Sequence, residues 1–156
     1  YDEQGKVFAY QGRAFGKETP KYVTIKLDEN KQKIYGLERV NFTKHIYVTE
    51  GPLDSLFLDN CIAAGGADLT LDSKINPEKV TYIFDNEPRN KEIIQRMEKI
   101  IDLGYNIFIW PEDIQLKDVN DLIMTGVSKL QLDEIISINT YSKLSAKQAL
   151  VNFKKI

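Results

Sequence analysis

Cysteine and histidine are almost absent from this chain of 156 residues, in which Cys61 is the only cysteine and His45 the only histidine. A disulfide framework needs cysteine pairs, and a structural zinc site needs several Cys or His ligands, so the chain builds neither by itself. Cys61 stands beside Ile62 and Ala63, which predicts a buried, unreactive thiol. Scarce cysteine agrees with a reducing cytoplasm.

Long hydrophobic runs are also missing. No apolar stretch reaches the length of about 18 residues that a transmembrane helix needs, so we expect no membrane association. The chain begins at Tyr1, and nothing near it has the pattern of a signal peptide, which suggests a fragment of a longer protein. An apolar fraction of 42% and a charged fraction of 28% are ordinary for a globular domain.

Charge is nearly balanced overall but unevenly distributed along the chain. The formal net charge is −2. Residues 1–49 contain nine Lys and Arg against six Asp and Glu, whereas residues 50–156 contain 12 against 17. A basic first part and an acidic second part suit phosphate contacts on one side and metal-binding carboxylates on the other, although a merely solvated surface would look similar.

Two regions differ in hydrophobic periodicity. Short β-prone runs at 7–10 and 22–25, separated by Gly, Pro and charged residues, predict a small N-terminal β-rich subdomain. From residue 45 onward strands and helices alternate, which predicts an α/β fold with a parallel sheet flanked by helices on both faces. The expected strands are 45–49, 61–64, 80–84 and 105–110, and the expected helices are 52–58, 90–103, 119–124, 130–138 and 145–153.

Acidic residues follow three of the expected strands. Glu50 comes directly after the first, Asp85 and Glu87 after the third, and Asp118 a short distance after the fourth. The carboxyl ends of parallel strands share one edge of a sheet, so these carboxylates are expected to meet there.

Gathered carboxylates repel one another. Two such charges about 4 Å apart repel by roughly 4 kcal/mol at an effective dielectric constant near 20. A divalent cation with oxygen ligands would offset that repulsion, so the acids predict a site for Mg²⁺ or Mn²⁺. Each acid taken alone also suits a helix N-cap or a turn. Gly51, and equally Gly65 with Gly66, would let a phosphate or metal approach the backbone, but a plain turn explains them as well.

These residues resemble the signature of Toprim proteins. Glu50, Gly51 and Asp54 match its Glu-Gly-x-x-Asp segment, and Asp85-Asn86-Glu87 matches its Asp-x-Asp segment with Glu in the last position. Topoisomerases, some nucleases and recombination mediators share this signature.

The N-terminal part narrows the resemblance. Gln11-Gly12-Arg13, Thr19-Pro20-Lys21-Tyr22 and Tyr35-Gly36-Leu37 are similar in order and spacing to a series found in DnaG-type bacterial and phage primases. The segment 117–122 is similar to the family's Asp-Pro-Asp-Glu-Leu, with Asn120 at its second Asp. The resemblance covers roughly residues 6–126 and suggests a phage branch.

The resemblance implies a nucleotidyltransferase that makes RNA primers from ribonucleoside triphosphates on a single-stranded DNA template. It implies Asp85, Glu87 and Asp118 as metal ligands, Glu50 as a ligand or as the group that helps deprotonate the attacking hydroxyl, and Gly51 and Asp54 as supporting residues. Arg13, Lys21 and Tyr22 would contact nucleic acid or nucleotide, with Tyr22 stacking on a base or packing in the core. A replicative helicase is the expected partner in a primosome, and the host cytoplasm is the expected location if a phage encodes the chain.

Two other functions stay open at this point. The same acids in a Toprim nuclease or topoisomerase fragment would cleave a phosphodiester, and a non-catalytic Toprim scaffold would bind DNA or a partner protein. The expected organisation is a basic N-terminal subdomain at 1–44, a Toprim domain at 45–126 and a C-terminal helical segment at 127–156.

Overall fold

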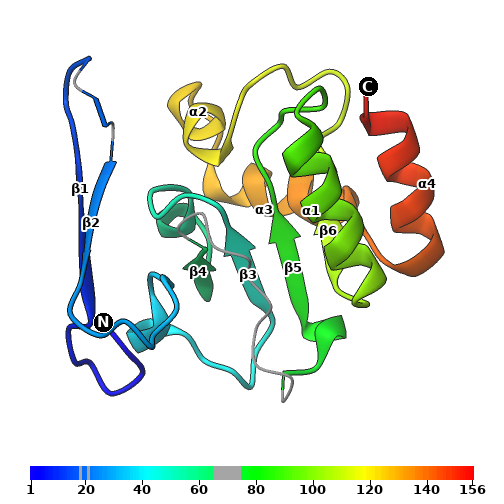
Figure 1. Cartoon of the computed structure of the whole chain (residues 1–156). Coiled ribbons are helices and arrows are strands. Elements are labelled where there is room, and N and C mark those ends of the chain that lie inside the picture. Colours follow the sequence, from blue (N-terminus) through cyan, green and yellow to red (C-terminus); the bar gives the residue numbers. More distant parts are fainter. Residues whose placement is uncertain (18, 21, 65–74) are drawn as a thin grey trace.

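The computed structural model describes residues 1–17, 19–20, 22–64 and 75–156, which form a two-stranded hairpin and a five-stranded sheet with helices (Figure 1). The strands are β1 (Ala9–Arg13), β2 (Tyr22–Lys26), β3 (Ile46–Thr49), β4 (Cys61–Ala63), β5 (Val80–Ile83), β6 (Asn106–Phe108) and β7 (Thr140–Tyr141). The α-helices are α1 (Lys91–Asp102), α2 (Val119–Met124), α3 (Lys129–Ile138) and α4 (Lys143–Phe153). The short 3-10 helices are η1 (Leu37–Arg39), η2 (Asp54–Phe57) and η3 (Pro77–Lys79).

The five-stranded sheet has the order β4-β3-β5-β6-β7 and is parallel except for β7. The central strands β3 and β5 are buried almost throughout, which is why both are near-continuous apolar runs rather than alternating ones. Thr49 is paired with Ile83 where the two strands end. The residues that follow these two strands therefore leave the sheet at the same edge.

Helices cover both faces of this sheet. Helix α1 crosses the front and packs beside α4, while α3 lies behind the sheet (Figure 1). Helix α1 begins where the Asn90 side chain accepts from the backbone N–H groups of Glu92 and Ile93, and it ends before Gly104, which has a φ of 86°. Within the described ranges, no helix is long and apolar enough to cross a bilayer.

The structure corrects three expected elements. Residues 52–58 form a turn and the 3-10 helix η2 rather than an α-helix, because Asp54 and Ser55 turn their polar side chains inward. Helix α4 begins two residues earlier than expected, at Lys143. The antiparallel strand β7 was not expected, since two residues are too few to show a period.

The hairpin of β1 and β2 stands apart from the sheet (Figure 1) and confirms the expected β-rich N-terminal part. The segment after it contacts the sheet beside β4, and its Ile34 and Val40 pack against the core. There Tyr35 and Ala63 exchange two backbone hydrogen bonds of 2.9 Å, which add a single rung to the free edge of β4. Gly36, with a φ of 93°, then turns the chain into η1.

Candidate functional site

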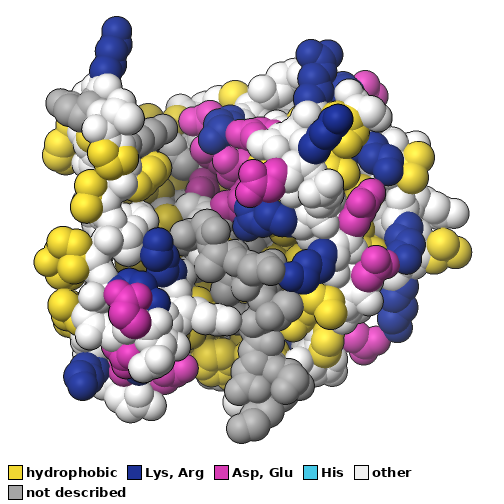
Figure 2. Space-filling view, viewed as in Figure 1, with side chains coloured by type: hydrophobic (Ala, Val, Ile, Leu, Met, Phe, Trp, Pro, Cys, Tyr) yellow, Lys and Arg dark blue, Asp and Glu magenta, His cyan; other side chains and the backbone are white. Residues whose placement is uncertain are grey.

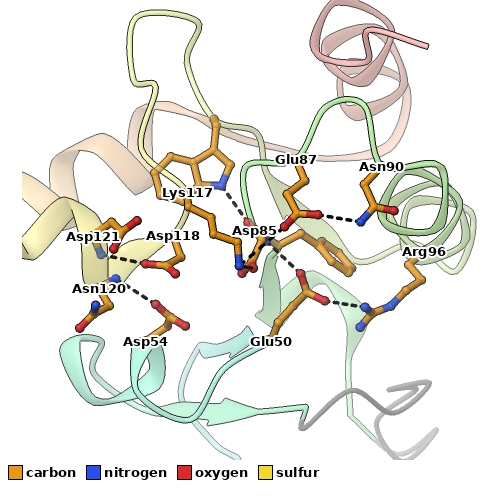
Figure 3. Close-up of polar contacts among 12 residues, drawn as sticks. Glu50, Asp54, Asp85, Glu87, Asn90, Arg96, Lys117, Asp118, Asn120 and Asp121 are labelled. Carbon is orange, nitrogen blue, oxygen red and sulfur yellow. Dashed lines mark hydrogen bonds and ion pairs between the residues drawn. The ribbon is translucent and has the colours of Figure 1, made fainter. Parts of the chain in front are cut away.

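Glu50 and Asp85 meet at the carboxyl edge of the sheet, as the sequence predicts. Glu50 follows β3, and Asp85 comes two residues after the neighbouring strand β5. The backbone N–H of Asp85 donates to Oε2 of Glu50 at 3.0 Å (Figure 3). This hydrogen bond of Glu50 connects the ends of β3 and β5, which are 35 residues apart in the sequence.

A lysine lies between the two acids that follow β5. The Nζ atom of Lys117 is 2.8 Å from Oδ2 of Asp85 and 3.6 Å from Oε1 of Glu87. The other oxygen of Glu87, Oε2, accepts from the side-chain amide of Asn90 at 2.6 Å. Burial raises the pKa of Asp85 in spite of the nearby ammonium group, while Asp85 in turn raises the pKa of Lys117.

Arg96 holds Glu50 from the opposite side. This arginine projects from α1 and forms an ion pair with Oε1 of Glu50, while its guanidinium lies 5.3 Å from the centre of the Phe84 ring. Both oxygens of Glu50 are therefore engaged, one by Arg96 and one by the backbone of Asp85. A carboxylate held at both oxygens has a fixed orientation.

Asp54 is the most deeply buried acid of the site. Its Oδ1 accepts from the backbone N–H of Asn120 at 2.9 Å, which joins η2 to the start of α2. Burial, followed by the nearby charges of Asp118 and Asp85, raises the pKa of Asp54 to about 6. A Cβ atom on Gly51 would lie 2.5 Å from Oδ2 of Asp54, so the side chain of any larger residue would displace this anchored carboxylate.

Asp118 caps a helix. Its Oδ1 accepts from the backbone N–H of Asp121 at 2.8 Å, at the N-terminus of α2. One of its oxygens is thus used by the helix, and its charge is still felt at Asp54 and Asp85. Of the acids considered, Asp118 is the one for which the N-cap interpretation describes the observed contact.

The donors of this site fit Mg²⁺ or Mn²⁺ by their chemistry, because all are carboxylate oxygens. Burial is the main cause of the raised pKa values of Asp54 and Asp85, and the charges of neighbouring acids add to it. In the described ranges, no three acidic, His or Cys side chains lie close enough together to hold a metal as they stand. Lys117, rather than a third acid, approaches the oxygens of Asp85 and Glu87.

Two of the predicted nucleic-acid residues, Arg13 and Tyr22, lie on the hairpin, which stands apart from the sheet (Figure 1). The Cζ atom of Arg13 is 5.5 Å from the centre of the Tyr22 ring, across the paired ends of β1 and β2. Tyr22 is 44% exposed, so it is not a core residue. Lys21, Gly65 and Gly66 lie outside the described residues. Figure 2 shows acidic side chains gathered on the surface between the hairpin and α1.

Three contacts of the site were missed from the sequence, those of Lys117, Arg96 and Asn90. Asn90 carried a signal, since an Asn directly before an amphipathic helix predicts an N-cap. Arg96 borders the apolar stripe of α1, three residues after Ile93, so it could be placed near the core. Lys117 carried no comparable signal, because the path of the loop before α2 decides where it lies.

Comparison with known proteins finds a phage primase among the relatives of this chain. No family model matches the chain. The chain is 40% identical over 159 aligned residues to the DNA primase of Enterobacteria phage T4, a match that covers 100% of this chain and 46% of that protein. The chain therefore spans about half the length of the curated relative it matches.

Solved structures of primase cores have the same fold. A DNA primase domain from Pseudomonas aeruginosa has a TM-score of 0.68 at 20% identity, covering 89% of this chain and 49% of its own. The E. coli primase catalytic core has a TM-score of 0.68 at 18% identity, covering 97% and 53%. The resemblance to the DnaG-type primase core is confirmed. This chain has the fold of the DnaG catalytic core, a mostly parallel sheet flanked by helices and preceded by a small β-rich part.

Proposed function

We propose that the chain is the catalytic core of a DNA primase, a nucleotidyltransferase that joins ribonucleotides on a single-stranded DNA template. The observation that carries this proposal is the Glu50–Asp85 contact at the edge of a primase-like sheet. It occurs in a chain that is similar over its whole length to a phage primase. A replicative helicase and a place in the primosome of the host cytoplasm belong to the proposal.

The reaction needs stabilisation of negative charge on the α-phosphate while the 3′-hydroxyl attacks and pyrophosphate leaves. Bound Mg²⁺ or Mn²⁺ would supply that charge stabilisation. Asp85 and Glu87 are the residues that would hold the ion, with Asp118 beside them. Glu50 orients this edge by accepting from the backbone N–H of Asp85. It would serve either as a further metal ligand or as the group that helps deprotonate the attacking hydroxyl.

The remaining residues would bind and orient. Asp54 ties the Glu-Gly-x-x-Asp segment to the start of α2 through Asn120, which keeps two acidic segments in register. On the hairpin, Arg13 and Tyr22 supply a cation beside an exposed aromatic ring, a combination suited to phosphate and base of a single strand. Lys21 is assigned to the same surface on the family resemblance alone.

The test is template-dependent incorporation of labelled ribonucleotides by Glu50→Gln and Asp85→Asn. Each change keeps the shape of the side chain but removes its charge, so we expect primer synthesis to fall by about a hundredfold or more. Glu98→Gln and Asp102→Asn are matched controls, since in the described part of the chain these acids of α1 form partly or largely exposed ion pairs with Lys154 and Lys147.

Thermal unfolding should show that all four variants are folded. Near-normal primer yield in both Glu50→Gln and Asp85→Asn would overturn the assignment of the site. Cleavage of labelled DNA with Mg²⁺, in place of synthesis, would instead support a Toprim nuclease.

A further inference from the structure

Lys117 places its positive charge beside the negative charges of Asp85 and Glu87, where a metal ion would otherwise balance them. Its ammonium group contacts one oxygen of Asp85 and lies near one of Glu87. The Lys117 side chain is 55% exposed, whereas those of Asp85 and Glu87 are 21% and 34% exposed. The ammonium group thus approaches these carboxylates from the solvent side.

The loop that carries Lys117 is fastened beside the acids. The backbone N–H of Asn86 donates to the carbonyl oxygen of Lys117 at 2.6 Å, so its backbone is fixed to the segment between Asp85 and Glu87. The four-carbon side chain keeps its own freedom of rotation. Because the backbone of Lys117 is fixed and its side chain is flexible, the ammonium group can move away from the carboxylates while the loop stays in place.

We propose that Lys117 is a resident counter-cation, which neutralises Asp85 and Glu87 in the metal-free protein and is displaced when a divalent ion binds the same oxygens. This inference rests on the metal site of the proposed function and adds a competitor to it. Mg²⁺ binds oxygen at about 2.0–2.1 Å and repels a neighbouring ammonium group. The two cations therefore exclude one another at Asp85, and the affinity for metal includes the work of removing Lys117.

An ordinary surface ion pair offers the contrast. The Nζ atom of Lys147 lies 2.7 Å from Oδ1 of Asp102, with both side chains more than half exposed, and within the described ranges Lys147 forms no ion pair with a second acid. Removing Lys147 would leave one well-solvated carboxylate. Removing Lys117 would leave two nearby acids without their cation, one of them an Asp whose pKa burial already raises.

The experiment measures Mn²⁺ binding by calorimetry and the melting temperature in EDTA and in Mg²⁺. The variants are Lys117→Met, which keeps side-chain length without charge, Lys117→Arg, which keeps charge, and Lys147→Met as the matched control. We expect Lys117→Met to bind Mn²⁺ roughly two- to fivefold more tightly, the range of an ion pair whose cation is about half exposed. We also expect it to melt lower than wild type in EDTA and to gain more from Mg²⁺.

Measuring Mn²⁺ binding at high salt distinguishes two effects of Lys117, direct competition with the metal for the carboxylate oxygens and long-range repulsion of the metal by its charge. At 1 M salt the Debye length is about 3 Å, so a long-range effect of the lost charge would disappear while the gain from direct competition would persist. Lys117→Arg and Lys147→Met should bind Mn²⁺ as wild type does.

Unchanged or weaker Mn²⁺ binding by Lys117→Met, with normal binding by wild type, would overturn this inference and leave the proposed function standing. A gain that vanishes at high salt would overturn it as well. Absence of Mn²⁺ binding in every variant would refute the metal site of the proposed function itself.

Discussion

Asp54 shows how one residue can hold a site together at a cost in stability. Its carboxylate accepts from the backbone of Asn120, but burial raises its pKa to about 6 from an ordinary value of 3.8. The folded state therefore binds the proton of Asp54 more tightly than the unfolded state does. Stability falls as the pH rises from about 4 to about 6, and above that range the loss is complete.

We predict that Asp54→Asn is more stable than wild type near pH 7.5 in EDTA by about 1–3 kcal/mol. The amide oxygen can still accept from Asn120, while the buried charge is gone. The advantage should shrink as the pH falls, to less than about 1 kcal/mol at pH 4, where the folded wild type is protonated. Urea unfolding at pH 4, 5.5 and 7.5 measures this.

The exposed Asp102→Asn serves as the control and should show no such dependence on pH. An equal stability difference for Asp54→Asn at all three pH values would contradict the burial of a charged Asp54.

The positions of site residues could be predicted from the sequence where the order of the strands determines them. Glu50 and Asp85 follow neighbouring parallel strands, so their meeting could be expected from the pattern of strands and acids. The contacts of Lys117 and Arg96 depend on loop path and on side-chain direction, which periodicity does not fix. The metal roles of Asp85, Glu87 and Asp118, and the nucleic-acid role of Arg13, stay predictions.

At the scale of elements, the side chain of Asn86 connects the loop between β6 and α2 to the segment that follows β5. The amide group of Asn86 donates to the carbonyl oxygens of Ile114 and Leu116 at 2.8 and 2.9 Å. Its backbone N–H donates to Lys117. The middle residue of the Asp-x-Asp segment thus positions the loop that carries Lys117 and Asp118.

We predict that Asn86→Asp destabilises the fold by about 1–3 kcal/mol, because a carboxylate cannot donate and would face two carbonyl oxygens. Urea unfolding measures the loss, and hydrogen exchange should show faster opening of residues 111–118. Asn152→Asp, an exposed change on α4, is the control. Unaltered exchange in that loop would show that Asn86 does not hold it.

Elements were predicted best where the pattern was long. The 14-residue apolar pattern at 90–103 gave α1 nearly as it is, and the buried runs gave β3 and β5. The errors concerned short elements. The segment 52–58 contains the 3-10 helix η2 instead of an α-helix, and its polar residues Asp54 and Ser55 are buried. Strand β7 has too few residues to show a pattern. The proposed boundaries at 44 and 126 stay predictions.

At the scale of the whole molecule, the hairpin and the sheet differ in how they are stabilised. The sheet is covered by helices and has a continuous buried core. The hairpin has two strands, and on one of its faces Tyr10, Val23 and Ile25 are 56%, 52% and 44% exposed. A two-stranded hairpin is only marginally stable by itself in water.

We predict that amides of β1 and β2 exchange with solvent at least about a hundredfold faster than those of β3 and β5, after correction for intrinsic rates. Native-state hydrogen exchange resolved by residue or by peptide measures this. Equal protection of hairpin and sheet would show that the two unfold as one unit. In that case the hairpin would have to be stabilised by contacts beyond its own pairing.

The rung between Tyr35 and Ala63 also limits growth of the sheet. An open edge of unpaired N–H and C=O groups is a template on which strands of other molecules can add. Tyr35 pairs with the last residue of β4, and the opposite edge is the two-residue strand β7. Among the described residues, neither margin of the five-stranded sheet offers a long free strand, so this sheet has little backbone on which strands of other copies could add.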